Sequence, residues 1–251
     1  MMSRPRFGAV RLAVALLAIG FVLAACEGGS GQPLIDPGDG GNYRTSLDPA
    51  DFVTRVDNPY FPLAPGSRWE YQAVGDGEMQ TIEVVVTDQT RDILGIRATV
   101  VRDTVRVDGE VIEDTFDWYA QDTAGNVWYL GEDTKEYENG QVVSTEGTWE
   151  AGVDGAQAGI VMKADPQVGN AYRQEFYRGQ AEDIAQVVRL GDSQTVPAGS
   201  YQGLLVTHEW TPLLADVVEE KYYAQGVGAV LESTVQGGSE RIELIAYQAG
   251  A

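Results

Sequence analysis

The chain has very little cysteine or histidine, with one Cys and one His among 251 residues. The lone thiol of Cys26 excludes a disulfide within the chain, and together with the lone His208 it excludes metal sites built from several thiolate or imidazole ligands. A Ser-His-Asp triad would have to use His208, but no Gly-x-Ser-x-Gly motif is present. Phosphate-binding glycine motifs are also absent from the sequence. We therefore interpret His208 as a strand residue bonded to a neighbour and predict no catalytic residue.

Basic residues are also scarce. The chain has 17 Lys and Arg against 38 Asp and Glu, which gives a net charge of −21. Removal of residues 1–25 would take away three arginines and no acid, which moves the net charge to −24. A surface of this sign repels nucleic acid and anionic lipid headgroups, so the sequence predicts no nucleic-acid partner. It could attract cations or basic partners, and it also keeps a protein soluble.

The N-terminus combines three features in a fixed order. Arginines at positions 4, 6 and 11 precede the uncharged run Leu12–Ala25, which is too short for a comfortable membrane span. Leu-Ala-Ala-Cys26 follows directly and resembles the bacterial lipobox, in which the cysteine thiol accepts a diacylglycerol. This resemblance implies a signal peptide at 1–25, lipidation of Cys26, and a membrane partner reached through that lipid. The protein is then expected on the cell membrane or outer membrane, facing the periplasm or the cell exterior.

Residues 26–43 read as a flexible tether, because Glu27 to Gly41 consists largely of Gly, Ser, Pro and Asp. A short helix is predicted from Ser46 to the residues before Asn58, because Ser-Leu-Asp-Pro supplies a cap and an early proline. The proline-rich stretch 58–66 cannot form a helix or a central strand, and we expect a fixed, partly buried lead-in there.

The remainder, within a single predicted domain over 44–251, reads as all-β. Short runs of β-branched and aromatic residues alternate with turn signals such as Asp108-Gly109 and Asn139-Gly140, which suit hairpins. This spacing predicts an antiparallel meander that forms a curved sheet or barrel-like domain with few short helices. The strands are expected at 67–74, 78–88, 93–107, 110–121, 126–131, 134–138, 141–145, 171–179, 184–190, 201–210, 217–225, 227–235 and 239–248, with a looser glycine-rich segment at 151–170.

In two of these strands, the order of apolar and polar residues indicates which side chains share a face of the sheet. Along 110–120, Ile112, Phe116 and Trp118 share one face with Asp114, and Glu113, Thr115 and Asp117 take the other, as in a half-buried sheet. The apolar positions of 93–107 change phase near Val100, which predicts a bulge or bend.

Aromatic side chains gather along the strands between 118 and 149, and those that face outward on a curved sheet could line a groove for an apolar or sugar ligand. Inward-facing rings would be ordinary core. The candidate ligand-binding residues are Trp118, Tyr119, Trp128, Tyr129 and Trp149.

Acidic side chains are also dense between 114 and 138. Hard oxygen ligands at this density could hold Ca²⁺, although the EF-hand pattern is absent and many acids fall in turns. No other cofactor is predicted. The same region could supply two carboxylates for a glycan hydrolase, which require a separation of about 5–10 Å across a groove. The candidate calcium ligands are Asp114, Asp117, Glu132 and Asp133.

Four motifs, spread over nearly the whole exported domain, resemble a family of uncharacterised bacterial secreted and lipid-anchored proteins. The motifs begin at Asn58 (Asn-Pro-Tyr-Phe-Pro-Leu-Ala-Pro-Gly-Ser-Arg-Trp-Glu-Tyr), Asp114 (Asp-Thr-Phe-Asp-Trp-Tyr-Ala-Gln-Asp), Gly125 (Gly-Asn-Val-Trp-Tyr-Leu-Gly-Glu-Asp-Thr) and Tyr223 (Tyr-Ala-Gln-Gly-Val-Gly). In outline, the predicted sheet is similar to lipoprotein carriers, whose curved sheet holds acyl chains. We therefore expect a non-enzymatic envelope lipoprotein that binds a hydrophobic or extended ligand, or a protein partner, on its sheet. The alternative is a carboxylate-based or calcium-dependent envelope enzyme.

Overall fold

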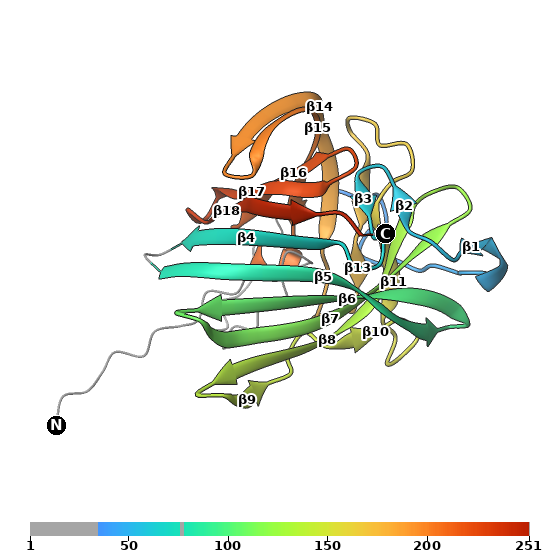
Figure 1. Cartoon of the computed structure of the whole chain (residues 1–251). Coiled ribbons are helices and arrows are strands. Elements are labelled where there is room, and N and C mark those ends of the chain that lie inside the picture. The colour runs from blue at the N-terminus through green and yellow to red at the C-terminus, as the bar shows by residue number, and fades with distance from the viewer. Residues whose placement is uncertain (1–34, 76–77, 251) are drawn as a thin grey trace.

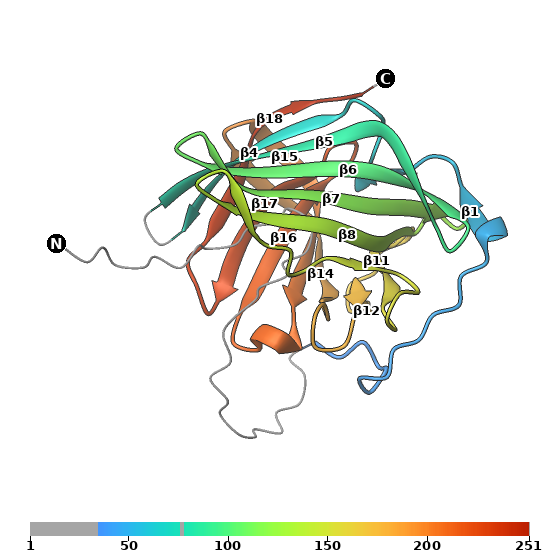
Figure 2. The same cartoon turned by 90° about the horizontal axis from the view of Figure 1, so that it is seen from below.

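The computed structural model describes residues 35–75 and 78–250, and its described strands form one large antiparallel sheet of sixteen strands that curls into a barrel-like shape (Figures 1 and 2). The predicted all-β, antiparallel fold class is confirmed. Along the main path the order is β12-β14-β15-β16-β17-β18-β4-β5-β6-β7-β8-β11-β13. The strands are β1 (Phe52–Val53), β4 (Arg68–Gly75), β5 (Glu78–Ile93), β6 (Ile96–Val107), β7 (Glu110–Asp122), β8 (Val127–Glu138), β9 (Gln141–Ser144), β10 (Trp149–Glu150), β11 (Gln157–Met162), β12 (Ala171–Arg173), β13 (Glu175–Phe176), β14 (Ile184–Val196), β15 (Gly199–Trp210), β16 (Val218–Ala224), β17 (Gly228–Gln236) and β18 (Arg241–Gln248).

A single stretch of chain, residues 171–176, joins the two ends of this path. Its first half pairs with β14, and its second half pairs with β11 on the opposite edge. Gly159 on β11 lies under this crossing, where an added Cβ would sit 2.3 Å from the backbone carbonyl carbon of Gln174. The sheet therefore nearly closes at a point where only glycine leaves enough room.

The hairpin turns follow the predicted chemistry. Asp108 and Gly109 have φ of +51° and +83°, and Asn139 and Gly140 have φ of +52° and +73°, as type I′ turns require. Two strand predictions were wrong in detail. The expected break before residue 134 does not occur, since β8 runs unbroken, and the glycine-rich segment 151–170 contains β11, which pairs with β8.

The predicted helix after Ser46 was also wrong. Only the single turn η1 (Pro49–Asp51) forms there, with the Asp48 side chain capping the backbone N–H of Ala50. The chain then pairs directly with β7 as strand β1. The segment before it is therefore too short to offset the free-energy cost of nucleating a helix. The second 3-10 turn is η2 (Pro212–Leu214). Within the described ranges, no helix has the length and apolar character needed to cross a membrane.

The predicted bulge near Val100 is present, and the extra residues lie on the partner strand β5. Val86 pairs with Val101, and the next pairing joins Thr90 to Thr99. This irregularity lets the long strands β5 and β6 bend, as Figure 2 shows for their far ends.

The lead-in segment 58–66 folds over one end of the barrel. It includes the small hairpin of β2 (Asp57–Asn58) and β3 (Phe61–Pro62). The buried Asn58 side chain donates to the carbonyls of Gly125 and Lys163, and the N–H of Gly226 donates to Pro59. The segment is therefore fixed and partly buried, as the prolines predicted.

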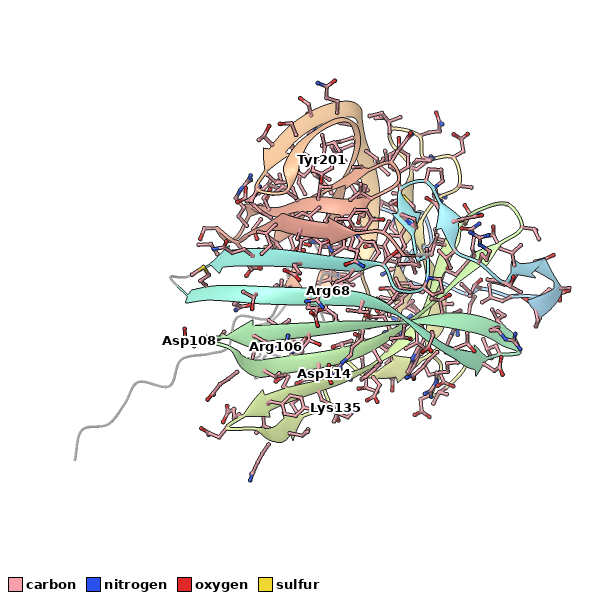
Figure 3. The ribbon with its side chains drawn as sticks, viewed as in Figure 1. Arg68, Arg106, Asp108, Asp114, Lys135 and Tyr201 are labelled. Carbon is pink, nitrogen blue, oxygen red and sulfur yellow. The ribbon has the colours of Figure 1, made fainter. Side chains whose placement is uncertain are left out.

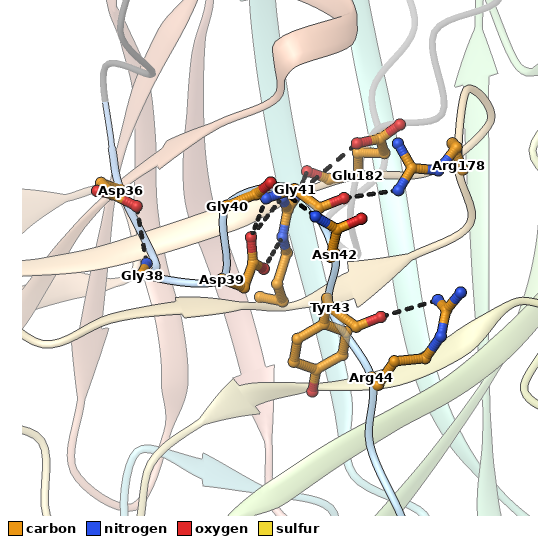
Figure 4. Close-up of polar contacts among 11 residues, drawn as sticks. Asp36, Gly38, Asp39, Gly40, Gly41, Asn42, Tyr43, Arg44, Arg178 and Glu182 are labelled. Atoms are coloured by element: carbon orange, nitrogen blue, oxygen red, sulfur yellow. Dashed lines mark hydrogen bonds and ion pairs between the residues drawn. The ribbon is translucent and has the colours of Figure 1, made fainter.

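The first described residues lie against the opposite end of the barrel. Ile35 is buried with Ile184, Trp210 and Val218. Asp39 accepts from the guanidinium of Arg173 at 2.8 Å (Figure 4). Of the predicted tether, residues 35–43 are thus held on the domain, while Cys26 and the predicted signal peptide lie outside the described residues.

Candidate functional site

The strand β7 places its polar face inside the barrel, which reverses the polarity expected of a half-buried strand. Thr115 and Asp117 are 1% and 0% exposed, and they lie beside their register partners on the adjacent strands β6 and β8. Phe116 and Trp118 lie on the outer face, where arginines cover them: the guanidinium of Arg91 lies 4.0 Å from the centre of a Trp118 ring. The alternation was predicted, but the side that faces inward is the polar one.

Four buried acids, Asp103, Asp117, Glu132 and Glu175, form what we call the carboxylate cluster. Asp117 and Glu132 lie directly opposite each other on β7 and β8. Burial is the largest cause of the raised pKa of Tyr119, and the negative charges of all four acids raise it further. The four acids therefore lie near that one ring. None of the ion pairs found in residues 35–75 and 78–250 involves Asp117, Glu132 or Glu175.

Hydrogen bonds satisfy this cluster only in part. The Tyr129 hydroxyl donates to Asp117 Oδ1 at 2.7 Å, and the Thr134 hydroxyl donates to Glu132 Oε2 at 3.0 Å. The other oxygens of these two carboxyls, and both oxygens of Glu175, are buried without a hydrogen-bond partner. A buried carboxylate without partners is costly, so protonation or a ligand must neutralise it.

The titration of these groups reflects that cost. Burial raises the pKa of Asp117 to about 7. Burial also raises the pKa of Glu132 well above its ordinary value, and the neighbouring Asp117 raises it further. For Glu175, burial is again the main cause of a raised pKa, followed by the charges of Asp183 and Glu132. Asp117, Glu132 and Glu175 are therefore more readily protonated than ordinary carboxyl groups.

A cavity of about 50 Å³ opens beside the cluster at the barrel end covered by the lead-in segment. By volume it holds about three or four water-sized groups. Asp103 and Asp117 line it together with apolar residues and a set of aromatic rings. The aromatic residues are Phe61, Trp69, Tyr71, Tyr119 and Tyr223.

A second buried group, the lysine-centred cluster, consists of Glu209, Glu219, Lys221 and Glu232 on β15 to β17. Lys221 Nζ lies 2.9 Å from Glu209 Oε2 and 3.4 Å from Glu232 Oε2. Burial lowers the pKa of Lys221, but the charges of Glu209 and Glu232 more than offset this and raise it well above its ordinary value. Burial raises the pKa of Glu232 despite the lysine, so the shorter contact with Glu209 is the principal ion pair.

The predicted aromatic residues are divided between the two faces. Tyr119 and Tyr129 stack inside the barrel with ring centres 4.9 Å apart, and Trp149 meets Tyr129 edge-on at 5.3 Å. Trp118 lies on the other face of the sheet, where Arg91 covers it and leaves it 4% exposed. Trp128 donates from its indole to Asp122 Oδ2 at 2.9 Å. Of the five, only Tyr119 lines the cavity.

The four predicted calcium ligands are likewise divided. Asp114 lies on the outer face of β7, where Arg102 Nε and Nη2 donate to its two oxygens at 2.7 and 3.0 Å (Figure 3). Asp133 is paired with Lys135 at 2.8 Å, while Asp117 and Glu132 are inside. Within the described part of the chain, no three acidic, histidine or cysteine side chains are placed to hold a metal ion.

The single histidine is bonded to a neighbour. His208 Nε2 lies 2.9 Å from Glu220 Oε1, and Arg189 holds the same carboxylate with two donors. These donors, Arg189 first, lower the pKa of Glu220 to about 2. This arrangement is a local network on the outer surface, separate from the cavity.

Sequence reasoning missed four of the five rings of the cavity: Phe61, Trp69, Tyr71 and Tyr223. All four belong to the motifs that begin at Asn58 and Tyr223, so the signal was present in the sequence. These motifs could not be recognised as one binding site from the sequence, because strands β4 and β16 line the same cavity only when the barrel has formed.

Comparison with known proteins finds similarity only at the level of solved structures. No protein-family model matches the chain, and no curated protein matches it. Among solved structures, it is similar to a protein from Bacteroides fragilis described as exported, with a YmcC-like fold (13% identity, TM-score 0.45). It is also similar to a protein from Parabacteroides distasonis described as a lipoprotein (10% identity, TM-score 0.42). Each match covers 76% of this chain and 99% of the other. Likeness at this level carries no information about activity.

Proposed function

We propose that this protein is a non-enzymatic lipoprotein of the bacterial cell envelope that binds a ligand through an apolar group held in the aromatic cavity. The observation that carries the proposal is the convergence of five aromatic rings from β3, β4, β7 and β16 on one cavity. A concave site of mostly apolar side chains with a few polar groups is the usual form of a small-ligand site. At about 50 Å³, the cavity accepts one group of a ligand, and the remainder would extend through its mouth.

The arrangement of the barrel ends supports a membrane-anchored binder. Ile35 contacts Val218 at the start of β16, while the cavity reaches Tyr223 near its end. The first described residue after Cys26 therefore lies by one end of β16, and the cavity lies by the other end. If a lipid at Cys26 holds the first end toward the membrane, the cavity lies at the end directed away from it.

An enzymatic role for the acids fits the geometry less well. Glycan hydrolysis by two carboxylates requires them to face each other across a groove that admits a sugar ring. Asp117 and Glu132 do face each other, but they are 0% and 2% exposed, beside a cavity of about 50 Å³. Asp114 and Asp133 are held in ion pairs on the outer face.

Ligand-detected NMR with benzyl alcohol as a neutral probe tests the binding site. Saturation transfer to the probe is expected for the unaltered chain, and it should fall at least tenfold in Ala229→Leu, whose larger side chain fills the cavity. Ala246→Leu, at an exposed strand position on β18, is the matched control and should bind as the unaltered chain does. Equal transfer in all three proteins would place the probe elsewhere and contradict the proposed site.

The anchor is tested separately by growing cells with an alkyne-labelled fatty acid. The full chain should carry the label and sediment with membranes, whereas Cys26→Ser should carry none. An unlabelled full chain would contradict lipidation without affecting the cavity.

A further inference from the structure

The floor of the aromatic cavity contains a buried carboxyl group, that of Asp117, for which the described residues provide no ion-pair partner. Asp103 and Asp117, which are 2% and 0% exposed, both line the cavity. Asp117 Oδ2 is buried without a hydrogen-bond partner, although its other oxygen accepts from Tyr129. An unpartnered acceptor on a residue that lines a cavity is suited to a donor supplied by a ligand.

The other side of the same barrel shows how the chain neutralises buried acids when it supplies the cation itself. There, Lys221 lies between Glu209 and Glu232, and the Tyr223 hydroxyl donates to Glu209 at 3.0 Å. Tyr71 lies between the two clusters. Burial is the main cause of its raised pKa, and the charges of Asp103 in the carboxylate cluster and of Glu232 in the lysine-centred cluster raise it further. The carboxylate cluster has the same kind of buried acids without the lysine.

The cavity walls also suit a positive charge. Aromatic faces attract ammonium and guanidinium groups, and this attraction grows when water is excluded. The chain already uses the same contact on its outside, where the Arg91 guanidinium lies over Trp118. The excess of acids over bases in the whole sequence would raise the local concentration of a cationic ligand.

We infer that the ligand group taken by this cavity is an organic ammonium on an apolar body, with its N–H donors on Asp117 and its apolar part between Trp69, Phe61 and Tyr119. This inference rests on the proposed binding function and specifies its ligand class. The cavity volume agrees, because an ammonium and the apolar carbons next to it fit within about 50 Å³, and the remainder of the ligand would extend through the mouth. The raised pKa of Asp117 is consistent with a carboxyl that lacks its counterion in the unliganded chain.

Two probes of nearly equal shape test the inference at pH 8: benzylammonium, which carries the charge, and benzyl alcohol, which does not. Titration calorimetry should show benzylammonium binding at least tenfold more tightly to the unaltered chain. Asp117→Asn should remove that preference while retaining the binding of benzyl alcohol. Asp183→Asn is the matched control, because Asp183 is also buried with its pKa raised to about 7 but does not line the cavity.

The outcomes separate the two proposals. If neither probe binds, the proposed binding function fails and the inference fails with it. If both bind with equal affinity, the binding function stands and the ammonium inference is overturned. The comparison of the two probes on the unaltered chain gives this answer even if Asp117→Asn does not fold. A preference that survives Asp117→Asn but disappears in Asp183→Asn would also overturn the inference, since it would place the charge recognition at the other end of the barrel.

Discussion

The two buried acid clusters occupy the same barrel interior and differ mainly in their counterion. In the lysine-centred cluster, Glu209 has an ammonium at 2.9 Å and two hydroxyl donors, from Thr207 and Tyr223. In the carboxylate cluster, Glu175 has no cation within ion-pair distance among the described residues, and burial raises its pKa although the neighbouring Trp149 side chain lowers it. Glu209 is therefore neutralised by a cation of the chain, although Glu232 Oε1 in the same cluster is buried without a hydrogen-bond partner. Asp117, Glu132 and Glu175 have no such cation among the described residues and depend on protons or on a ligand. Such a division marks the second cluster as the functional candidate, because natural proteins tend to satisfy purely structural buried groups.

Removing the lysine should have the largest effect on this comparison. Lys221→Met leaves Glu209 buried without its cation, and breaking a buried pair in this way costs about 3–5 kcal/mol. Urea unfolding at pH 7 measures the loss. Lys135→Met, which breaks the exposed pair with Asp133, should change the free energy of unfolding by less than about 1 kcal/mol. A loss below 1 kcal/mol for Lys221→Met would show that its charge does little for the fold.

The carboxylate cluster should make the protein more stable in mild acid than in mild base. Asp117 has a folded pKa of about 7, above its ordinary value of 3.8. Its stabilising contribution is therefore full below the unfolded pKa and is lost as the pH rises through 7. The loss is on the order of 2–3 kcal/mol between pH 5 and 8. Glu220, with its pKa lowered to about 2, acts in the opposite direction, but only below pH 5.

Melting temperatures from pH 5 to pH 8 test this dependence. We expect a steady decrease over that range, with a shallower slope in Asp117→Asn. A melting temperature that rises toward pH 8 would contradict the assignment of an uncompensated cluster. Because an ammonium ligand would stabilise the ionised form, saturating benzylammonium should also flatten the slope.

Neutralising Glu175 should produce a smaller change of the opposite sign to that of Lys221→Met. Glu175→Gln keeps the shape of the side chain and removes the cost of burying an ionisable group, which must either stay protonated or carry a charge without a counterion. At pH 8 the substitution should therefore stabilise the protein by about 1–2 kcal/mol. The same substitution at Glu209, which has a counterion, should destabilise it. Urea unfolding of both variants at one pH distinguishes the clusters directly, and equal signs would mean that the difference between them is not electrostatic.

The smallest effect is expected on the outer face. Arg91 is about half exposed, covers Trp118 and pairs with Glu150 at 2.5 Å. Exposed contacts of this kind contribute little, so Arg91→Ala should cost about 0.5–1 kcal/mol. Thermal unfolding at low and high salt would detect it, and a loss above 2 kcal/mol would show that the cover over Trp118 is part of the core.

Much of the fold could be predicted from local sequence patterns. Strand periodicity predicted an antiparallel β domain. Asp108-Gly109 and Asn139-Gly140 predicted hairpin turns. Both predictions were possible because these features depend only on residues that are neighbours in sequence. The phase change near Val100 gave the bulge for the same reason. β11 was hidden by glycines at 152, 155 and 159, of which Gly159 serves the close approach of the crossing segment. That approach is a long-range contact, so local patterns could not reveal it.

The candidate site was predictable only in fragments. Asp117, Glu132 and Tyr119 were among the candidate residues, but they were grouped with outward-facing neighbours such as Asp114 and Trp118. Alternation along a strand separates two faces without saying which of them is enclosed. The usual assumption that the apolar face points inward fails for β7, because this barrel encloses acids and covers its outer aromatics with arginines.

The β class, the turns, the acidic charge and the motif around Cys26 could all be read along the chain, since each follows from composition or from residues close together in sequence. Which acids are buried, which of them receive a lysine, and which rings meet at the cavity are consequences of the tertiary fold. Those properties depend on strands as distant in sequence as β4, β7 and β16 sharing one interior. The energy of a buried charge is set by whatever lies across that space, and so it cannot be read from the residues beside it in the chain.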